Sequence, residues 1–319
     1  NAAGTTGYET LTAVNGLLVD RAGEVPLSRL YTALTGQPAG FAAVAEAGKR
    51  VILADAVAAE LTRLATVASR PGGVLAGTAV ATARETIAEV ISRLDAYRPF
   101  AGSPRTVDAL DRACAQASTD RSDLAEQIEK IRVHALGDSE FATRFGQLTA
   151  VVYAKGVEDT AFYRHSRLLS LNEVGGNPDR FGISIEEFHD FAVRLQQNTP
   201  TAMTTLSTHD TKRGEDVRAR IAVLSELAGQ WEPAVRRWMA LGEKLGCPDP
   251  RTGYFFWQTL VGAWPLDAER AARYLEKATR EAKLFTSWLA PDKAYDRAVR
   301  TFVEQVFNKD YSQRWKEGA

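Results

Sequence analysis

The stretch FAAVAEAGKRVILADAVAAELTRLATVASR, residues 41–70, decides the fold class. Its apolar residues recur at three- and four-residue spacing, as on one face of an α-helix, while Arg and Glu fill the opposite face. The stretch therefore predicts an amphipathic helix, and Pro71-Gly72-Gly73 is expected to end it because proline lacks an N–H donor. The predicted buried stripe comprises Val44, Val51, Ala54, Val57, Leu61 and Leu64.

Helical patterns continue on both sides of this stretch. Ser184-Ile185-Glu186-Glu187 fits a capping box that opens a helix to about Gln197. Other helices are expected from periodicity, and Tyr254 to Val261 fits either a helix or a strand. These further helices are centred on Ile87–Leu94, within Thr106–His134 and Ser139–Tyr153, after Gly214 with Val217, Ile221 and Leu224 inward, along Trp231, Val235 and Trp238, and over Asp267–Leu289 and Lys293–Phe307.

A single stretch reads clearly as a strand. Thr201 to Ser207 follows Pro200 and is a short run of β-branched and apolar residues, which is typical of a buried strand. Such a strand would present Thr208-His209-Asp210-Thr211 at its C-terminal end. The sequence thus predicts a mostly helical chain with one strand-centred polar block in its middle.

Composition narrows the class of protein. The 319 residues include 39 Lys plus Arg and 40 Asp plus Glu, a formal net charge of −1, which does not suggest a nucleic-acid-binding or membrane-surface protein. The two cysteines favour a reducing, cytoplasmic setting, and neither a signal peptide nor a membrane-spanning stretch is visible. Because the chain starts at Asn1 rather than Met, we expect it to be a piece of a longer polypeptide.

Three clusters concentrate side chains that can do chemistry. They are Lys155-Gly156-Val157-Glu158-Asp159, then Asn172-Glu173, then His209-Asp210 followed by Lys212 and Arg213. A carboxylate at the end of a strand, beside a histidine and two cations, sits where α/β barrels place reactive groups. Glycoside chemistry needs carboxylates because its transition state carries positive charge. The alternative is that these charges form solvated turns and local salt bridges, such as one between Lys155 and Glu158.

Other chemistries find little support. The four histidines show no ligand spacing, so neither a metal site nor a cofactor is predicted, and Gly48-Lys49 does not form a phosphate loop. Cys114 is expected to be a core residue and Gly175-Gly176 a tight turn. Trp231 and Trp238 are expected to pack in the core, whereas Trp257 and Trp264 fit either packing or stacking on a sugar ring.

Longer strings carry a resemblance to a known family. Residues 154–164 (AKGVEDTAFYR), 169–176 (LSLNEVGG) and 207–220 (STHDTKRGEDVRAR) strongly resemble the maltooligosyltrehalose synthases, a branch of the α-amylase family. Gly4-Thr5-Thr6-Gly7-Tyr8, Val14 to Leu17 and Glu276 to Trp288 look like further pieces, so the resemblance covers essentially the whole chain.

The resemblance implies a fold and an activity. The fold is α/β, part of a (β/α)8 TIM-type barrel with large, mostly helical insertions, and predominantly α in this chain. Expected segments are an insertion region at 1–153, a barrel segment with active-site loops at 154–230 and a helical region at 231–319. The implied activity is that of an isomerase, an intramolecular transglycosylation with retention that converts the reducing-end α-1,4 linkage of a maltooligosaccharide into an α,α-1,1 linkage.

The same resemblance implies roles for single residues. Asp210 takes the role of the carboxylate that stabilises the transition state, and His209 binds the sugar at the cleavage point. The other implied substrate-binding residues are expected to meet Asp210 in one cleft, where Tyr8 and Tyr163 offer flat faces to a glucose ring. Besides these two tyrosines they are Lys155, Glu158, Asp159, Arg164, Lys212 and Arg213.

The chain departs from a full enzyme of this family. The nucleophile and the acid/base belong to barrel strands that precede Gly4-Thr5-Thr6-Gly7-Tyr8, and the closing strand and a β-domain would follow Ala319. We therefore expect a central segment that is inactive alone and needs the missing parts. Two alternatives stay open: a maltooligosaccharide hydrolase of the same family, which Lys155 to Asp159 disfavours, and a helical binding or scaffold module without catalysis.

Overall fold

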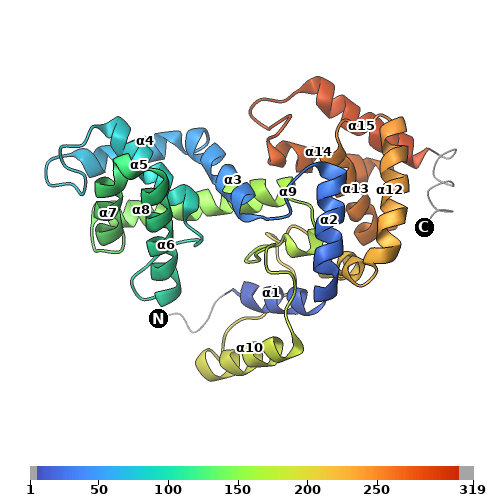
Figure 1. Ribbon diagram of the computed structural model, residues 1–319, viewed down its shortest axis with the longest axis horizontal. Coiled ribbons are helices and arrows are strands. Elements are labelled where there is room, and N and C mark those ends of the chain that lie inside the picture. The colour runs from blue at the N-terminus through green and yellow to red at the C-terminus, as the bar shows by residue number, and fades with distance from the viewer. Residues whose placement is uncertain (1–5, 309–319) are drawn as a thin grey trace. The chain divides into compact units, whose positions relative to one another are not determined.

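The computed structural model describes residues 6–308, and these residues contain helices and loops but no β-strand. Gly4, Thr5 and Trp315 lie outside the described residues. The chain divides into two compact units, one comprising residues 42–161 and the other the residues on either side of it, up to Phe41 and from Phe162. A predominantly helical chain is thereby confirmed (Figure 1).

The unit of residues 42–161 is a helical bundle. It contains α3 (Ala42–Ala54), α4 (Ala58–Ser69), α5 (Val80–Arg93), α6 (Pro104–Asp120), the short η2 (Ser122–Leu124), α7 (Ala125–His134), α8 (Glu140–Tyr153) and η3 (Ala154–Ala161). Their apolar faces form one core that includes Leu61, Leu64, Ile87 and Cys114, as predicted. The single helix predicted for residues 41–70 is wrong in one respect, because a turn at 55–57 divides it into α3 and α4.

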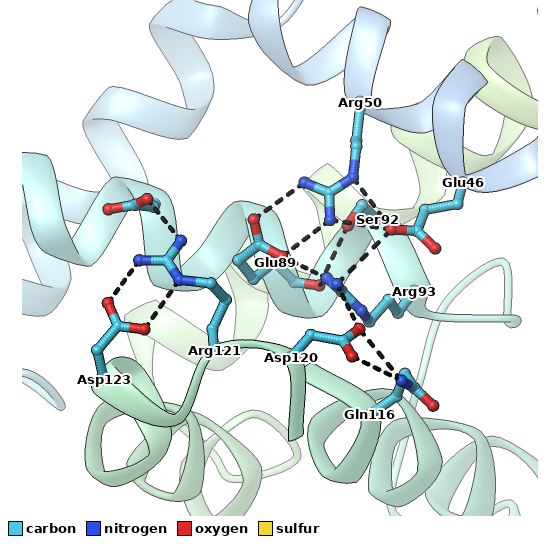
Figure 2. A network of polar contacts seen from close by, with 10 residues as sticks. Glu46, Arg50, Glu89, Ser92, Arg93, Gln116, Asp120, Arg121 and Asp123 are labelled. Atoms are coloured by element: carbon cyan, nitrogen blue, oxygen red, sulfur yellow. Dashed lines mark hydrogen bonds and ion pairs between the residues drawn. The ribbon is translucent and has the colours of Figure 1, made fainter. Parts of the chain in front are cut away.

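Charged side chains tie the helices of this unit together on its surface (Figure 2). Glu89 accepts from Arg50 Nη1 at 3.0 Å and is also bonded to Arg93, whose Nη2 donates to Asp120 at 2.9 Å. The nearby guanidinium groups hold the pKa of Glu89 down at about 2, chiefly through the hydrogen bond from Arg50. The network therefore connects α3, α5 and α6 through one carboxylate.

The second unit is built around an aromatic core. It contains α1 (Tyr8–Leu17), η1 (Arg21–Gly23), α2 (Glu24–Thr35), α9 (Phe162–Arg164), η4 (Leu169–Leu171), α10 (Ile185–Asn198), α11 (Glu215–Ala222), η5 (Val223–Ser225), α12 (Ala228–Lys244), α13 (Pro250–Ala263), α14 (Ala268–Ala282) and α15 (Lys293–Phe307). Trp231, Trp238 and Trp257 pack with one another and with Phe302, so Trp257 is a core residue, whereas Trp264 is 39% exposed.

Local sequence signals account for most helix boundaries here. The Ser184 side chain accepts from the Glu187 backbone N–H and Glu187 answers on the N–H of Ser184, which confirms the predicted capping box of α10. Asp267 caps α14, which ends at Ala282 and not at Leu289 because Lys283 takes a left-handed backbone with φ 52°. Tyr254 to Val261 lies within α13 and is helical.

The predicted strand at Thr201 to Ser207 is wrong in this structure. The segment is an irregular loop between α10 and α11, with Met203 63% and Leu206 42% exposed. A strand needs a neighbour to accept and donate its backbone hydrogen bonds, and residues 6–308 supply no paired segment. The loop backbone instead packs on Gly7, where an added Cβ would lie 2.8 Å from the carbonyl oxygen of Met203. Gly7 has φ 91°, which glycine adopts without strain.

Candidate functional site

The loop of residues 206–214 places His209 and Asp210 at its exposed tip. His209 is 89% and Asp210 64% exposed at the side chain, and His209 Nε2 lies 3.4 Å from Asp210 Oδ2. Thr208 braces the tip, since its hydroxyl accepts from the Asp210 N–H at 3.2 Å and its carbonyl oxygen accepts from the Thr211 hydroxyl at 2.8 Å. The tip therefore offers an accessible carboxylate and imidazole on an ordered turn.

Tyr8 lies beside this tip, as the sequence analysis expected. Its hydroxyl is 3.0 Å from the hydroxyl oxygen of Thr208, although the two residues are 200 positions apart in the chain. Tyr8 begins α1, directly after Gly7, and Gly7 contacts the backbone of residues 203–205. The start of α1 and the polar loop thus form one local arrangement.

A buried carboxylate supports the loop from below. Glu173 is 1% exposed, and its two oxygens accept the backbone N–H groups of Lys212 at 2.7 Å and Arg213 at 3.1 Å. Arg218 of α11 pairs with the same carboxylate at 3.2 Å and is itself buried. The sequence analysis singled out Asn172-Glu173 but gave Glu173 no role. An acidic residue between a buried Leu168–Leu171 run and a glycine turn was the signal that pointed inward.

Lys212 and Arg213 differ in their surroundings. The Arg213 side chain is 7% exposed, its Nη1 donates to the carbonyl oxygens of Leu169 and Asn172 at 3.3 and 3.4 Å, and its guanidinium lies 5.5 Å from the centre of the Phe255 ring. Arg213 is thus engaged inside the fold, whereas Lys212 is half-buried at its edge. A substrate contact by either side chain stays a prediction.

Tyr163 and Arg164 line a different hollow of the same unit, beside α13 and α14. Tyr163 is 7% exposed and packs on Phe255, and Arg164 Nε donates to the carbonyl oxygen of Ala282 at 2.6 Å at the end of α14. Burial lowers the pKa of Arg164. The hollow is also lined by Asp249, Arg251, Phe285 and Tyr295.

Lys155, Glu158 and Asp159 lie in η3, in the unit of residues 42–161. η3 is a π-helix, a rare geometry that is frequent at functional sites, and the Thr160 hydroxyl donates to the Lys155 carbonyl oxygen at 2.7 Å within it. Lys155 Nζ pairs with Asp159 Oδ2 at 2.6 Å, so the local salt bridge considered for Lys155 is made with Asp159. A common cleft with Asp210 stays a prediction, because the two groups belong to different units.

Metal ligands and membrane spans were searched over the described residues. Within residues 6–308 no group of three or more His, Cys, Asp or Glu side chains is placed to hold a metal ion. No helix in the same range is long and apolar enough to cross a membrane. Cys114 and Cys247 are both free thiols.

Comparison with known proteins supports one family, although no family model matches the sequence. A Mycobacterium tuberculosis protein named as a maltooligosyl trehalose synthase is 37% identical over 96% of this chain. The crystal structure of maltooligosyltrehalose synthase from Arthrobacter ramosus matches 99% of the chain at 34% identity with a TM-score of 0.88. A Sulfolobus tokodaii protein described as a hypothetical maltooligosyl trehalose synthase matches 99% at 26% identity with a TM-score of 0.79.

The helical fold and the exposed His209–Asp210 tip therefore match those of a carbohydrate-active enzyme class. Within that class, the predicted resemblance to the maltooligosyltrehalose synthases is confirmed over nearly the whole chain. The chain spans 40% of the length of each of these relatives. The match is thus to a part of such an enzyme, which agrees with the expectation of a segment.

Proposed function

We propose that this chain is the central segment of a maltooligosyltrehalose synthase, a (1→4)-α-D-glucan 1-α-D-glucosylmutase. The substrate is a maltooligosaccharide, and the reaction moves its reducing-end glucose from an α-1,4 to an α,α-1,1 linkage within one molecule. The observation that carries the proposal is the exposed His209–Asp210 tip within the string of residues 207–220. The chain alone is inactive, because it lacks two of the three carboxylates that the family uses.

Asp210 acts in this proposal as a fixed anion toward the sugar. Its side chain is accessible, and its backbone N–H is held by the Thr208 hydroxyl, so the carboxylate sits on an ordered turn. Cleavage of a glycosidic bond builds positive charge on the sugar ring in the transition state. A preorganised carboxylate stabilises that charge at no cost of reorganisation during the reaction.

The remaining residues bind and orient the substrate. His209, beside Asp210, donates or accepts a hydrogen bond to a hydroxyl of the sugar at the cleavage point. Tyr8 offers its ring next to Thr208. Lys155, Glu158, Asp159, Tyr163, Arg164, Lys212 and Arg213 complete the binding set by their match to the family's strings.

The complete enzyme of this proposal includes a (β/α)8 barrel. Residues 201–207 form one of its strands once neighbouring strands from the rest of the polypeptide supply backbone partners. Its nucleophile and acid/base come from that remainder and stand about 5–5.5 Å apart, as a retaining mechanism requires. The enzyme is cytoplasmic, in keeping with two free cysteines.

The test compares the isolated chain with the full polypeptide that contains it. Each is incubated with maltopentaose, and reducing ends and free glucose are measured over time. The full polypeptide is expected to remove reducing ends without a matching release of glucose, and the isolated chain to remove none. Release of glucose as the main product by the full polypeptide would identify a hydrolase instead. Steady turnover by the isolated chain would show that the catalytic groups are misassigned.

A further inference from the structure

The side chain of Glu173 joins two stretches of the chain that are far apart in sequence. It follows Asn172, whose amide donates to the carbonyl oxygens of Phe162 at 2.9 Å and His165 at 2.6 Å. It precedes a tight turn in which the Gly176 N–H donates to the Glu173 carbonyl oxygen at 2.8 Å and Gly175 has φ 76°. The backbone of Glu173 is therefore fixed on both sides.

All of the carboxylate's hydrogen-bonding capacity is used inside the protein. Oε1 accepts from the N–H groups of Val174 at 2.8 Å and Lys212 at 2.7 Å, and Oε2 accepts from the N–H of Arg213 at 3.1 Å and from Arg218 Nη1 at 3.2 Å. An ionised carboxylate has about four acceptor sites, so these four donors satisfy it. Two of the four are backbone groups of the loop that carries Asp210.

Arg218 closes the arrangement at both ends of that loop. Besides Glu173, its guanidinium donates to the carbonyl oxygens of Leu206 and Arg213, which lie before and after His209 and Asp210. The side chains of Arg218 and Glu173 are only 4% and 1% exposed, so water does not screen their attraction. The exposed tip thus rests on a buried ion pair that binds its two ends.

We infer that Glu173 is a positioning residue for the reaction: with Arg218 it holds the 206–213 loop so that Asp210 keeps its place facing the sugar. This role rests on the function proposed above for Asp210. Glu173 touches no substrate atom, and its effect on the reaction passes through the Lys212 and Arg213 amides.

The decisive variant is Glu173→Gln in the full polypeptide. Glutamine keeps the shape but turns an N–H₂ group toward donors that need an acceptor, so one end of the loop is released. The matched control is Glu24→Gln, which also removes a carboxylate from a buried arginine, Arg167, at 3.4 Å and in the same unit but away from the loop. Melting curves set an assay temperature at which every variant is folded.

Two readouts decide the inference. Hydrogen exchange followed by mass spectrometry is expected to show the 208–214 peptide of Glu173→Gln exchanging at least about tenfold faster, since its amides lose their acceptor. With maltopentaose, kcat is expected to fall about 100-fold, as for misplacement of a catalytic group, with a smaller rise in KM. Glu24→Gln is expected to change neither. A folded Glu173→Gln protein with normal loop exchange or normal kcat would overturn the inference, because a purely structural residue lowers only the melting temperature.

A second variant covers failure of the first to fold. Arg218→Lys keeps a cation beside Glu173 but cannot reach both carbonyl oxygens of the loop ends, so faster exchange of the 206–214 region and a roughly tenfold lower kcat are expected. Normal values of both would contradict the inference. If the unmodified polypeptide is inactive on maltopentaose, the proposed function fails, and the exchange comparison alone then decides whether Glu173 holds the loop.

Discussion

Replacement of Gly48 by alanine tests how the string of residues 154–161 is packed. α3 and η3 cross within the unit of residues 42–161 at Gly48 and Gly156. A Cβ added at Gly48 would lie 2.3 Å from the Gly156 carbonyl oxygen, and one added at Gly156 would lie 2.6 Å from Lys49 Cα. Both obstacles are backbone atoms or close to them, so no flexible side chain can swing away.

The expected magnitude is the difference of two opposing effects. Alanine favours a helix over glycine by about 1 kcal/mol. Ordinary contacts of a Cβ begin at 3.4 Å, so α3 and η3 must separate by roughly 1 Å, and overpacking of this kind costs about 1–3 kcal/mol with the lost contacts added. Because the steric cost is larger, Gly48→Ala is expected to lower the free energy of unfolding by about 1–2 kcal/mol.

The assay is urea denaturation of the chain followed by circular dichroism. Gly229→Ala is the matched control, since Gly229 is also helical, in α12, and has no atom within 4 Å of an added Cβ. It is expected to leave stability unchanged or raise it by up to about 1 kcal/mol. If Gly48→Ala stabilises the chain as Gly229→Ala does, the close crossing of α3 and η3 is not present in solution.

Three further predictions concern charge and catalysis. Glu89→Gln is expected to cost about 1–2 kcal/mol at neutral pH in urea melts, and because the folded pKa of Glu89 is about 2, its contribution should fade as pH drops from about 4.5 toward 2. Burial lowers the pKa of His165 to about 3, so the unfolded state takes up the proton first and stability should fall as pH drops below about 6.5; thermal melts of His165→Phe from pH 7 to pH 4 should show a flatter profile, and an unchanged slope would contradict this. In the full polypeptide, Asp210→Asn should keep substrate binding and lose about 10²–10³ in kcat, whereas His209→Ala should damage both kcat and KM; near-normal turnover of Asp210→Asn in steady-state kinetics would make Asp210 a structural residue.

The helices could largely be predicted from the sequence. The predicted bounds of α15 match the structure, and the capping box of α10 begins where Ser184 and Glu187 indicated. These features depend on residues three or four positions apart, so a short window contains all the interacting groups. The family strings likewise identified the exposed His209–Asp210 tip.

Tertiary structure decided the features that join distant parts of the chain. Residues 201–207 have the composition of a strand but form a loop, because a strand exists only where another segment supplies its hydrogen bonds. The part played by Glu173 likewise depends on donors about 40 residues further along, at Lys212, Arg213 and Arg218. Periodicity and caps are local and were therefore determined by the sequence alone, whereas the partners of a buried carboxylate are set only when the fold brings them within hydrogen-bonding distance.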